Sequence, residues 1–181
     1  MMFTLALILG VMSAAAAAAP QQERNQESGD LNIMEMAKVN ETLVVIKRKH
    51  TPNKPYRCLS ATKKHNDSKT HYQYNLRARF GRSGPYVNQT VNVTLVPLSE
   101  GGYKSNYTDR DNVSYTLTLK TMEEDGSCFV IFTQKSDGNQ GCELLVPRSK
   151  VNSTIPKVCK RYYKQCDGNN TILHKRDCIY I

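Results

Sequence analysis

The chain has 181 residues, of which 39% are hydrophobic and 23% are charged, and its formal net charge is +9. This length suits one globular domain with a hydrophobic core. The positive charge favours acidic partners such as heparan chains or anionic membranes, but the basic residues are spread along the chain, which favours a merely solvating role. We expect no nucleic-acid partner, because the chain contains no recognisable binding motif for one.

The N-terminal segment is typical of a secretory signal. Residues 3–12 form an apolar run, and residues 13–19 are small. The alternative is a membrane anchor, but the apolar run is short for a bilayer span and alanine is only mildly hydrophobic. We therefore predict a cleaved signal at residues 1–19, a flexible stretch at 20–30 and one domain at 31–181, in a secreted, extracellular protein with no membrane span.

Most of the domain is predicted to be β-structure. After a short predicted helix at residues 31–39, eight runs with strand character are separated by turn signals rich in Gly, Pro, Asn and Asp. The runs are residues 41–50, 55–65, 71–80, 86–98, 102–108, 112–120, 127–134 and 142–147. Evenly spaced short strands favour an up-and-down barrel or a sandwich.

Predicted glycosylation sites indicate which side of each strand faces solvent. The acceptor pattern N-x-S/T begins at Asn40, Asn66, Asn88, Asn92, Asn106, Asn112, Asn152 and Asn169. Because a glycan must point outward, the alternate residues should point inward. The predicted inner residues are Val87, Gln89, Val91, Val93, Leu95, Val113, Tyr115, Leu117 and Leu119. The alternation of residues 71–80 adds Tyr72, Tyr74, Leu76, Ala78 and Phe80.

The inner wall predicted in this way is aliphatic with several tyrosines. A small barrel either fills its interior with side chains or holds one small ligand. Tyrosine suits a ligand pocket because it combines an apolar body with one polar group. The alternative is that these tyrosines are ordinary half-buried strand residues, and periodicity does not decide between the two.

Six cysteines in an oxidising compartment predict three disulfides, for which fifteen pairings exist. There is no C-x-x-C pair and no histidine at zinc-finger spacing, so we predict no metal site. A helix is predicted over residues 153–168, with Ser153 or Thr154 near its N-cap and Pro156 in its first turn. Cys159 and Cys166 would lie on one face of this helix, together with Tyr162 and Tyr163.

These elements together resemble the tick salivary lipocalins of the histamine-binding protein family. The likeness rests on Cys142-Glu143-Leu144, on Cys159 and Cys166 at C-x6-C, on Cys178 and on Cys58-Leu59-Ser60-Ala61. It implies an all-β fold: an eight-stranded antiparallel lipocalin barrel, one C-terminal α-helix packed outside and a short N-terminal helix. It also implies the disulfide pairs Cys58–Cys178, Cys128–Cys159 and Cys142–Cys166.

The sequence departs from the family pattern in ways that bear on the ligand. Leu145 stands where the family often has Trp, and Glu35-Met36-Ala37 lacks the Trp of the family's N-terminal motif. Amine-binding members use inward carboxylates, whereas the inner faces predicted here hold almost no acid. Most acids fall in turns, among them Asp109, Asp111 and Asp137. The scarcity of inward acids and the predicted pocket of Val, Leu, Phe and Tyr therefore favour a lipid, eicosanoid or sterol over a biogenic amine such as histamine.

We predict that the protein sequesters a small host mediator in its barrel and so suppresses host inflammation and immunity. The predicted ligand-binding residues are Tyr72, Tyr74, Leu76, Val91, Val93, Tyr103, Tyr107, Tyr115, Leu117 and Glu143. Two alternatives stay open: a protein-binding immunomodulator that acts on a host immune protein through its surface, and a glycosaminoglycan binder driven by charge.

Enzymatic activity is not predicted. The chain has no nucleophile elbow, no phosphate loop and no metal-ligand spacing, so we expect a binding protein with no catalytic residues and no cofactor. We also expect it to be a monomer. The four histidines lie among polar residues and are expected at the surface; they are His50, His65, His71 and His174.

Overall fold

The computed structural model describes residues 29–66 and 68–181. The predicted signal at 1–19, and all but the last two residues of the predicted flexible stretch, lie outside this part of the chain. The elements, in chain order, are α1 (Met34–Ala37), β1 (Leu43–Arg48), β2 (Tyr56–Asn66), β3 (His71–Phe80), β4 (Tyr86–Pro97), β5 (Tyr103–Thr108), β6 (Ser114–Met122), β7 (Phe129–Lys135), β8 (Gln140–Pro147), the 3-10 helix η1 (Arg148–Lys150), α2 (Lys157–Gln165) and β9 (Thr171–Ile172).

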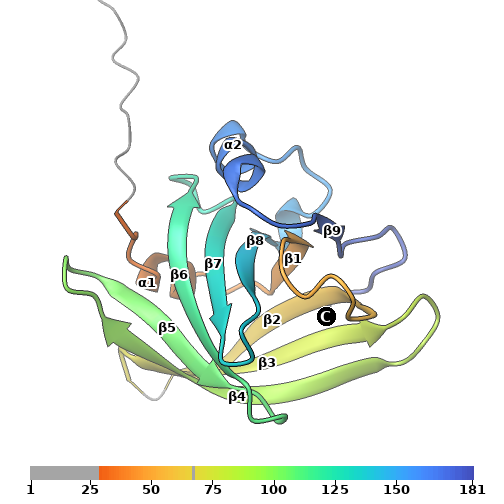
Figure 1. The fold of residues 1–181 in the computed structure, drawn as a ribbon, viewed down its shortest axis with the longest axis horizontal. Coiled ribbons are helices and arrows are strands. Elements are labelled where there is room, and N and C mark those ends of the chain that lie inside the picture. The colour runs from red at the N-terminus through yellow and green to blue at the C-terminus, as the bar shows by residue number, and fades with distance from the viewer. Residues whose placement is uncertain (1–28, 67) are drawn as a thin grey trace, which may run out of the picture.

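Strands β1 to β8 close into an antiparallel barrel (Figure 1). Each of β2 to β7 pairs with the next strand along the chain, and β1 pairs with both β8 and β2. The short β9 pairs with the end of β1. The predicted eight-stranded barrel is confirmed, and the sandwich is wrong, because the β1–β2 pairing leaves no second sheet.

Alternation along β4 sets the two faces of the barrel wall. Val91, Val93 and Leu95 are buried, whereas Asn88 and Asn92 are exposed. This is the phase that the glycosylation patterns predict. Asn40, Asn112, Asn152 and Asn169 are exposed as well, and Asn106 is half-buried. Glycosylation itself stays a prediction at all eight asparagines, and the side chain of Asn66 lies outside the described residues.

The apolar side chains form two cores, one on each side of the barrel wall. The inner core contains Leu43, Val45, Leu119, Phe129, Ile131 and Leu145, together with Ile33 beside α1. The outer core contains Val44, Ile46, Val130, Leu144 and Val146, which lie beneath α2. Strands β7 and β8 therefore carry nearly continuous apolar runs, because both of their faces are buried.

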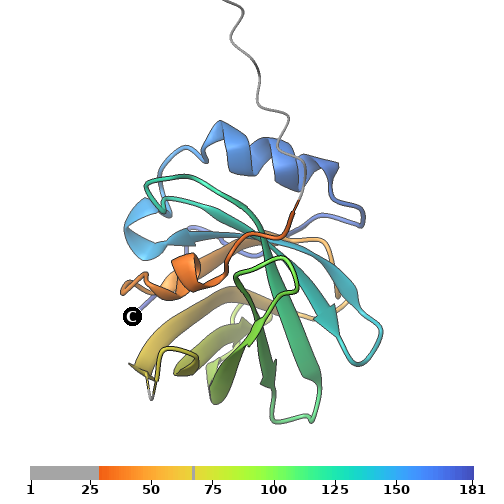
Figure 2. The same ribbon diagram turned by 90° about the vertical axis from the view of Figure 1, so that its left-hand side faces the viewer.

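Helix α2 lies along the outside of the barrel (Figure 2) and is shorter than predicted. It begins after Pro156, whose ψ of 147° is not helical. Its first hydrogen bond runs from the Lys160 amide to the Pro156 carbonyl, 3.0 Å away. The predicted N-cap at Ser153 or Thr154 is wrong, because the segment before Pro156 is a loop and proline itself takes the cap position.

Three disulfides attach the C-terminal part of the chain to the barrel. They join Cys58 to Cys178, Cys128 to Cys159, and Cys142 to Cys166. These are the pairs that the family resemblance implies. Two of them fix α2 to β8 and to the residue preceding β7, so the position of the helix is held covalently.

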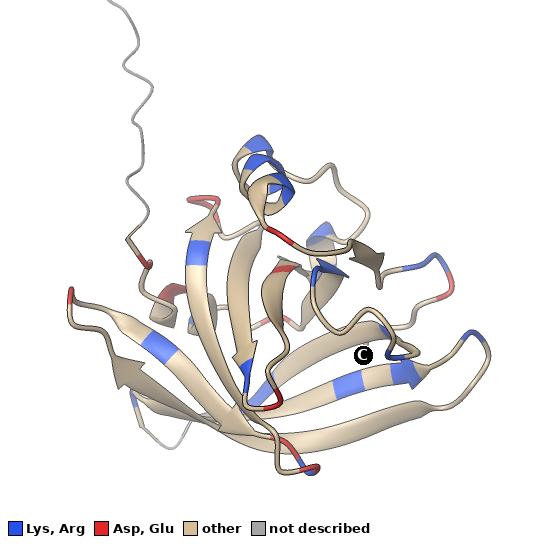
Figure 3. Cartoon of the chain, in the orientation of Figure 1, with Lys and Arg blue, Asp and Glu red and all other residues tan. Residues whose placement is uncertain are grey.

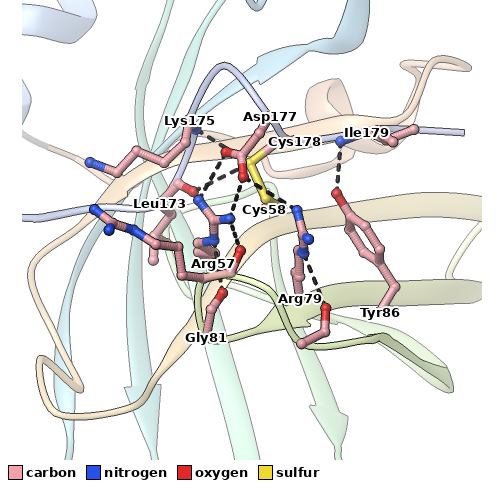
Figure 4. Close-up of polar contacts among 12 residues, drawn as sticks. Arg57, Cys58, Arg79, Gly81, Tyr86, Leu173, Lys175, Asp177, Cys178 and Ile179 are labelled. Atoms are coloured by element: carbon pink, nitrogen blue, oxygen red, sulfur yellow. Dashed lines mark hydrogen bonds and ion pairs between the residues drawn. A yellow bond between two sulfur atoms is a disulfide. The ribbon is translucent and has the colours of Figure 1, made fainter.

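The C-terminal tail lies against β2, β3 and the start of β4 (Figure 4). The Asp177 carboxylate accepts hydrogen bonds from Arg57 and Arg79, and the Ile179 amide donates to the Tyr86 hydroxyl at 2.7 Å. The hydrogen bond from Arg57 is the main cause that holds the pKa of Asp177 below 3.8. These exposed ion pairs orient the tail beside the Cys58–Cys178 disulfide but stabilise it little.

Candidate ligand cavity

The barrel encloses a cavity of about 350 Å³. This volume lies in the lower part of the range typical of small-molecule sites. Most of the wall is apolar and comes from the inward side chains of β1, β3, β4, β6 and β8. Ile33, Met36 and Ala37 beside and within α1 line the cavity at the end where β1 begins.

Polar side chains gather at the opposite end, where β1, β5 and β7 finish. The cavity residues there are Arg48, His50, Tyr107, Asp109, Asp111, Tyr115, Lys135, Asp137 and Glu143. The cavity therefore has an apolar body and a polar mouth. A ligand that matches it would carry an apolar part and one polar head.

His50 and Glu143 form a contact at the polar end. The Nε2 atom of His50 lies 2.6 Å from Oε1 of Glu143, and its Nδ1 atom lies 2.8 Å from the Thr51 hydroxyl. His50 is only 5% exposed, so its predicted surface location is wrong. Thr51, with φ of 49°, begins the turn after β1 and lies beside the ring. His174 is half-buried and bonded to the Tyr180 hydroxyl, whereas His65 and His71 are exposed as predicted.

Arg48 is a buried cation in the cavity wall. Its guanidinium donates to the Thr51 carbonyl at 3.0 Å, while its Nε has no hydrogen-bond partner within residues 29–66 and 68–181. Desolvation lowers the pKa of Arg48, and the negative charge of Glu143 opposes that shift. The Nε–H is thus an unused donor in an enclosed, charged site.

A β-bulge explains why sequence alternation missed Arg48. Strict alternation from Leu43 and Val45 would turn Lys47 inward and Arg48 outward. The β1–β8 register shifts between Val45 and Lys47, which adds one residue to β1. Arg48 consequently faces the cavity.

Tyr107 and Tyr115 are cross-strand neighbours that stack with their ring centroids 4.5 Å apart. The Tyr115 hydroxyl donates to Asp109 at 3.0 Å, while the Tyr107 hydroxyl makes no hydrogen bond to any described residue. Desolvation is the main cause that raises the pKa of Tyr107 well above 10.0. Tyr107 therefore offers the cavity a neutral hydroxyl donor.

Acidic residues contribute more to the cavity than the sequence predicts. Asp109, Asp111 and Asp137 do lie in turns, but the β5–β6 and β7–β8 turns form the rim of the mouth. Lys135 is paired with Asp137 at 3.3 Å. Glu143 is the one cavity acid that lies on a strand, as predicted, but the sequence did not predict that the turn acids reach the cavity, because periodicity does not place turn residues relative to a barrel opening.

Nine of the ten predicted ligand-binding residues line the cavity. They are Tyr72, Tyr74, Leu76, Val91, Val93, Tyr107, Tyr115, Leu117 and Glu143. Tyr103 instead packs against the inner core near α1, where its carbonyl accepts from the Ile33 amide at 3.1 Å. Phe80, predicted to face inward, is 48% exposed at the rim. Contact with a ligand stays a prediction for all ten.

The ionisation of Tyr74 gives the first test of the cavity. Burial raises its pKa from 10.0 to about 12, mainly by desolvation. Between these pH values the unfolded chain loses the proton while the folded chain keeps it, so the free energy of unfolding falls as pH rises, by up to about 2–3 kcal/mol in total. We expect Tyr74→Phe to remove this part of the pH dependence in urea unfolding at pH 9 and pH 11. If the free energy of unfolding changed equally between pH 9 and pH 11 in both proteins, the Tyr74 hydroxyl would not be buried.

The described residues contain neither a cluster suited to bind a metal nor a helix suited to span a membrane. No cluster of His, Cys, Asp and Glu among residues 29–66 and 68–181 has the arrangement of a metal site. None of the helices in that same part of the chain has the length and apolarity to cross a membrane.

A closed eight-stranded barrel with an internal cavity and one helix after the barrel defines the lipocalin class of ligand-binding proteins. The chain belongs to the tick histamine-binding protein family, since the family model described as "Tick histamine binding protein" matches residues 20–179. The predicted family membership is confirmed.

One solved structure supports this fold. Japanin from Rhipicephalus appendiculatus, bound to cholesterol, aligns with a TM-score of 0.56 and 14% identity over 76% of this chain and 95% of its own. A de novo designed fluorescence-activating β-barrel aligns with a TM-score of 0.46 and 13% identity, over 65% of this chain and 99% of its own. None of the curated proteins compared with the sequence matches it.

Proposed function

We propose that this protein is secreted, captures one small amphipathic host mediator in its barrel, and thereby suppresses host inflammation and immunity. The observation that carries the proposal is the cavity of about 350 Å³, whose wall is apolar except at one end. Capture is stoichiometric, and its main driving force is burial of the apolar part of the ligand.

The polar end favours a head group that accepts hydrogen bonds. The Arg48 Nε and the Tyr107 hydroxyl are both donors without a partner among the described residues. A carboxylate or a hydroxyl would satisfy them and would relieve the cost of leaving them unpaired. This supports a fatty acid, an eicosanoid or a sterol, and the cholesterol in the Japanin structure is in line with the last of these.

Removing the Tyr107 hydroxyl tests the head-group assignment. We expect Tyr107→Phe to bind arachidonic acid about 5- to 30-fold more weakly, because one hydrogen bond of about 1–2 kcal/mol is lost. Titration calorimetry on delipidated protein measures the change. Tyr72→Phe is the matched control, because its hydroxyl already donates to the Lys69 carbonyl at 2.8 Å. Equal affinities of both variants and the unaltered protein would remove Tyr107 from the site.

A biogenic amine is the second candidate, favoured by the acids at the mouth. Glu143 and Asp109 lie beside the stacked rings of Tyr107 and Tyr115, and carboxylates next to aromatic faces attract ammonium groups. Glu143 is already paired with His50, so an ammonium would have to compete with the ring. This competition makes the amine the less favoured ligand.

Native mass spectrometry of the secreted, deglycosylated protein separates these candidates. A co-purified lipid or sterol supports the favoured ligand class and identifies it. An empty barrel that then binds histamine or serotonin supports the amine. An empty barrel that binds neither shifts support to a protein-binding immunomodulator with the barrel as scaffold.

A further inference from the structure

Positive charge is concentrated on the outer side of α2. Between Glu143 and Asp167 the sequence contains six Lys and Arg residues and no Asp or Glu. Four of the six lie on α2, namely Lys157, Lys160, Arg161 and Lys164. All four are exposed, and Figure 3 shows the basic segments of α2 at the top of the molecule, outside the barrel.

These four residues, the basic stripe, share one face of the helix. Their spacing is i, i+3, i+4 and i+7, which at about 100° per residue places them within an arc of about 100°. The buried residues Cys159 and Tyr163 lie on the opposite side. The basic stripe therefore points straight into solvent, and its cations occupy a length of about 10 Å.

The basic stripe carries uncompensated charge. None of its four residues forms an ion pair with any residue in the described ranges 29–66 and 68–181. Some exposed cations outside α2 are paired, as Lys38 is with Glu35 and Arg110 with Asp111. Four unpaired cations on two helical turns repel one another, and a multivalent anion laid along them would relieve that repulsion.

The position of the basic stripe is fixed before any partner binds. Two disulfides hold α2, through Cys159 and Cys166, and Tyr163 is buried with its hydroxyl 3.0 Å from Asn170 Oδ1. Lys49 donates to the carbonyls of Lys164 and Cys166 at the C-terminal end of the helix. A helix held in this way loses little backbone entropy on binding.

We propose that the basic stripe binds an extracellular sulfated polysaccharide. An anionic membrane is disfavoured because α2 has none of the exposed large apolar side chains of the described chain, which are Phe80, Ile172, Ile179 and Ile181. A nucleic acid is disfavoured because the disulfide-bonded fold belongs to an oxidising compartment. Such binding would retain the protein at a sulfated matrix, and it is independent of the barrel cavity.

Heparin binding with two matched variants tests this proposal. The stripe variant replaces Lys157, Lys160, Arg161 and Lys164 with Gln, which is a good helix former. The control variant replaces Lys64, Lys69, Arg82 and Lys104 with Gln, so both variants remove four charges from a net charge of +9. Circular dichroism and arachidonic-acid binding verify that both variants keep the folded barrel.

We expect the stripe variant to bind heparin at least about tenfold more weakly at physiological salt. The slope of log affinity against log salt should decrease by about three, since each lost contact removes about 0.7–0.9. The control variant should keep a slope close to that of the unaltered protein. Equal losses of heparin affinity in the two variants would overturn the proposal, because they would mean that heparin is attracted by the net charge of the protein and not by the basic stripe.

Three further measurements complete the test. Tighter binding to single-stranded DNA than to heparin would overturn the polysaccharide assignment, as would binding to phosphatidylserine vesicles that exceeds binding to heparin. Heparin binding should also persist in the protein that carries its natural glycans. The predicted sites Asn152 and Asn169 lie beyond the two ends of α2, and loss of binding in the glycosylated form would overturn a role for the stripe in the secreted protein.

Discussion

Leu117→Asp should abolish capture of an apolar ligand while the barrel stays folded. Leu117 lines the cavity from β6, and an apolar ligand would desolvate a carboxylate placed there. Since an uncompensated buried charge costs several kcal/mol, the affinity for arachidonic acid or cholesterol should fall at least about 100-fold. Displacement of a fluorescent fatty acid from delipidated protein measures this loss.

The substituted protein should fold because the new carboxylate would face an open cavity. Thr133 lies opposite Leu117 on β7 and is buried, with a hydroxyl that has no partner among the described residues. This hydroxyl would be a donor close to the new carboxylate. The protein without ligand should therefore keep a cooperative thermal transition.

Thr116→Asp is the matched control, since the neighbouring residue on β6 points to the outer side of the wall. It should leave lipid affinity within about twofold of the unaltered protein. A histamine titration adds a second readout, because an inward carboxylate should preserve or raise affinity for a cation. Unchanged lipid affinity in a folded Leu117→Asp protein would refute the cavity as the lipid site.

Removal of the Cys58–Cys178 disulfide should cause the largest loss of stability. The linked residues are 120 positions apart, whereas Cys142 and Cys166 are 24 apart. If chain entropy dominates, the first bond contributes about 5 kcal/mol and the second about 3.5 kcal/mol. Cys58→Ser with Cys178→Ser should therefore destabilise the protein by about 1.5 kcal/mol more than Cys142→Ser with Cys166→Ser.

Urea unfolding of both double variants, without reductant, gives this comparison. The Asp177 contacts with Arg57 and Arg79 remain in the first variant, but they are exposed and replace little of the lost constraint. Limited proteolysis should cut residues 173–181 in the first variant only. The reverse order of stabilities would mean that packing beneath α2, and not loop length, decides the contribution of each bond.

Much of the fold follows from local patterns along the chain. The turn signals separate eight runs, and the glycosylation patterns around Asn88 and Asn92 orient β4 correctly. Such patterns work because a strand alternates between two environments with a period of two. They also predict most of the cavity residues, since an inward side chain in a closed barrel has little space other than the interior, whereas Glu143 was predicted from the family motif.

The predictions from sequence fail where the backbone departs from the two-residue alternation of a strand, or where segments far apart in the chain meet. The bulge between Val45 and Lys47 turns Arg48 inward, and the turn at Thr51 lies beside His50, which reaches Glu143. Tyr103 lies at the very start of β5, where α1 and the inner core cover it. No local sequence pattern encodes these contacts, because each one forms between a strand end and whatever other segments lie at the same end of the closed barrel.

The sequence by itself determined where the strands lie along the chain, which residues of most strands face inward, and which cysteines can pair. Only the tertiary structure decided the composition of the polar end and the exposure of the basic stripe to solvent. Barrel closure brings the turns at Asp109 and Asp137 to the mouth that Arg48 and Glu143 reach from the wall. Docking of α2 buries Tyr163, so its four cations face solvent together. Both outcomes depend on contacts between residues far apart in the chain, which local propensity does not specify.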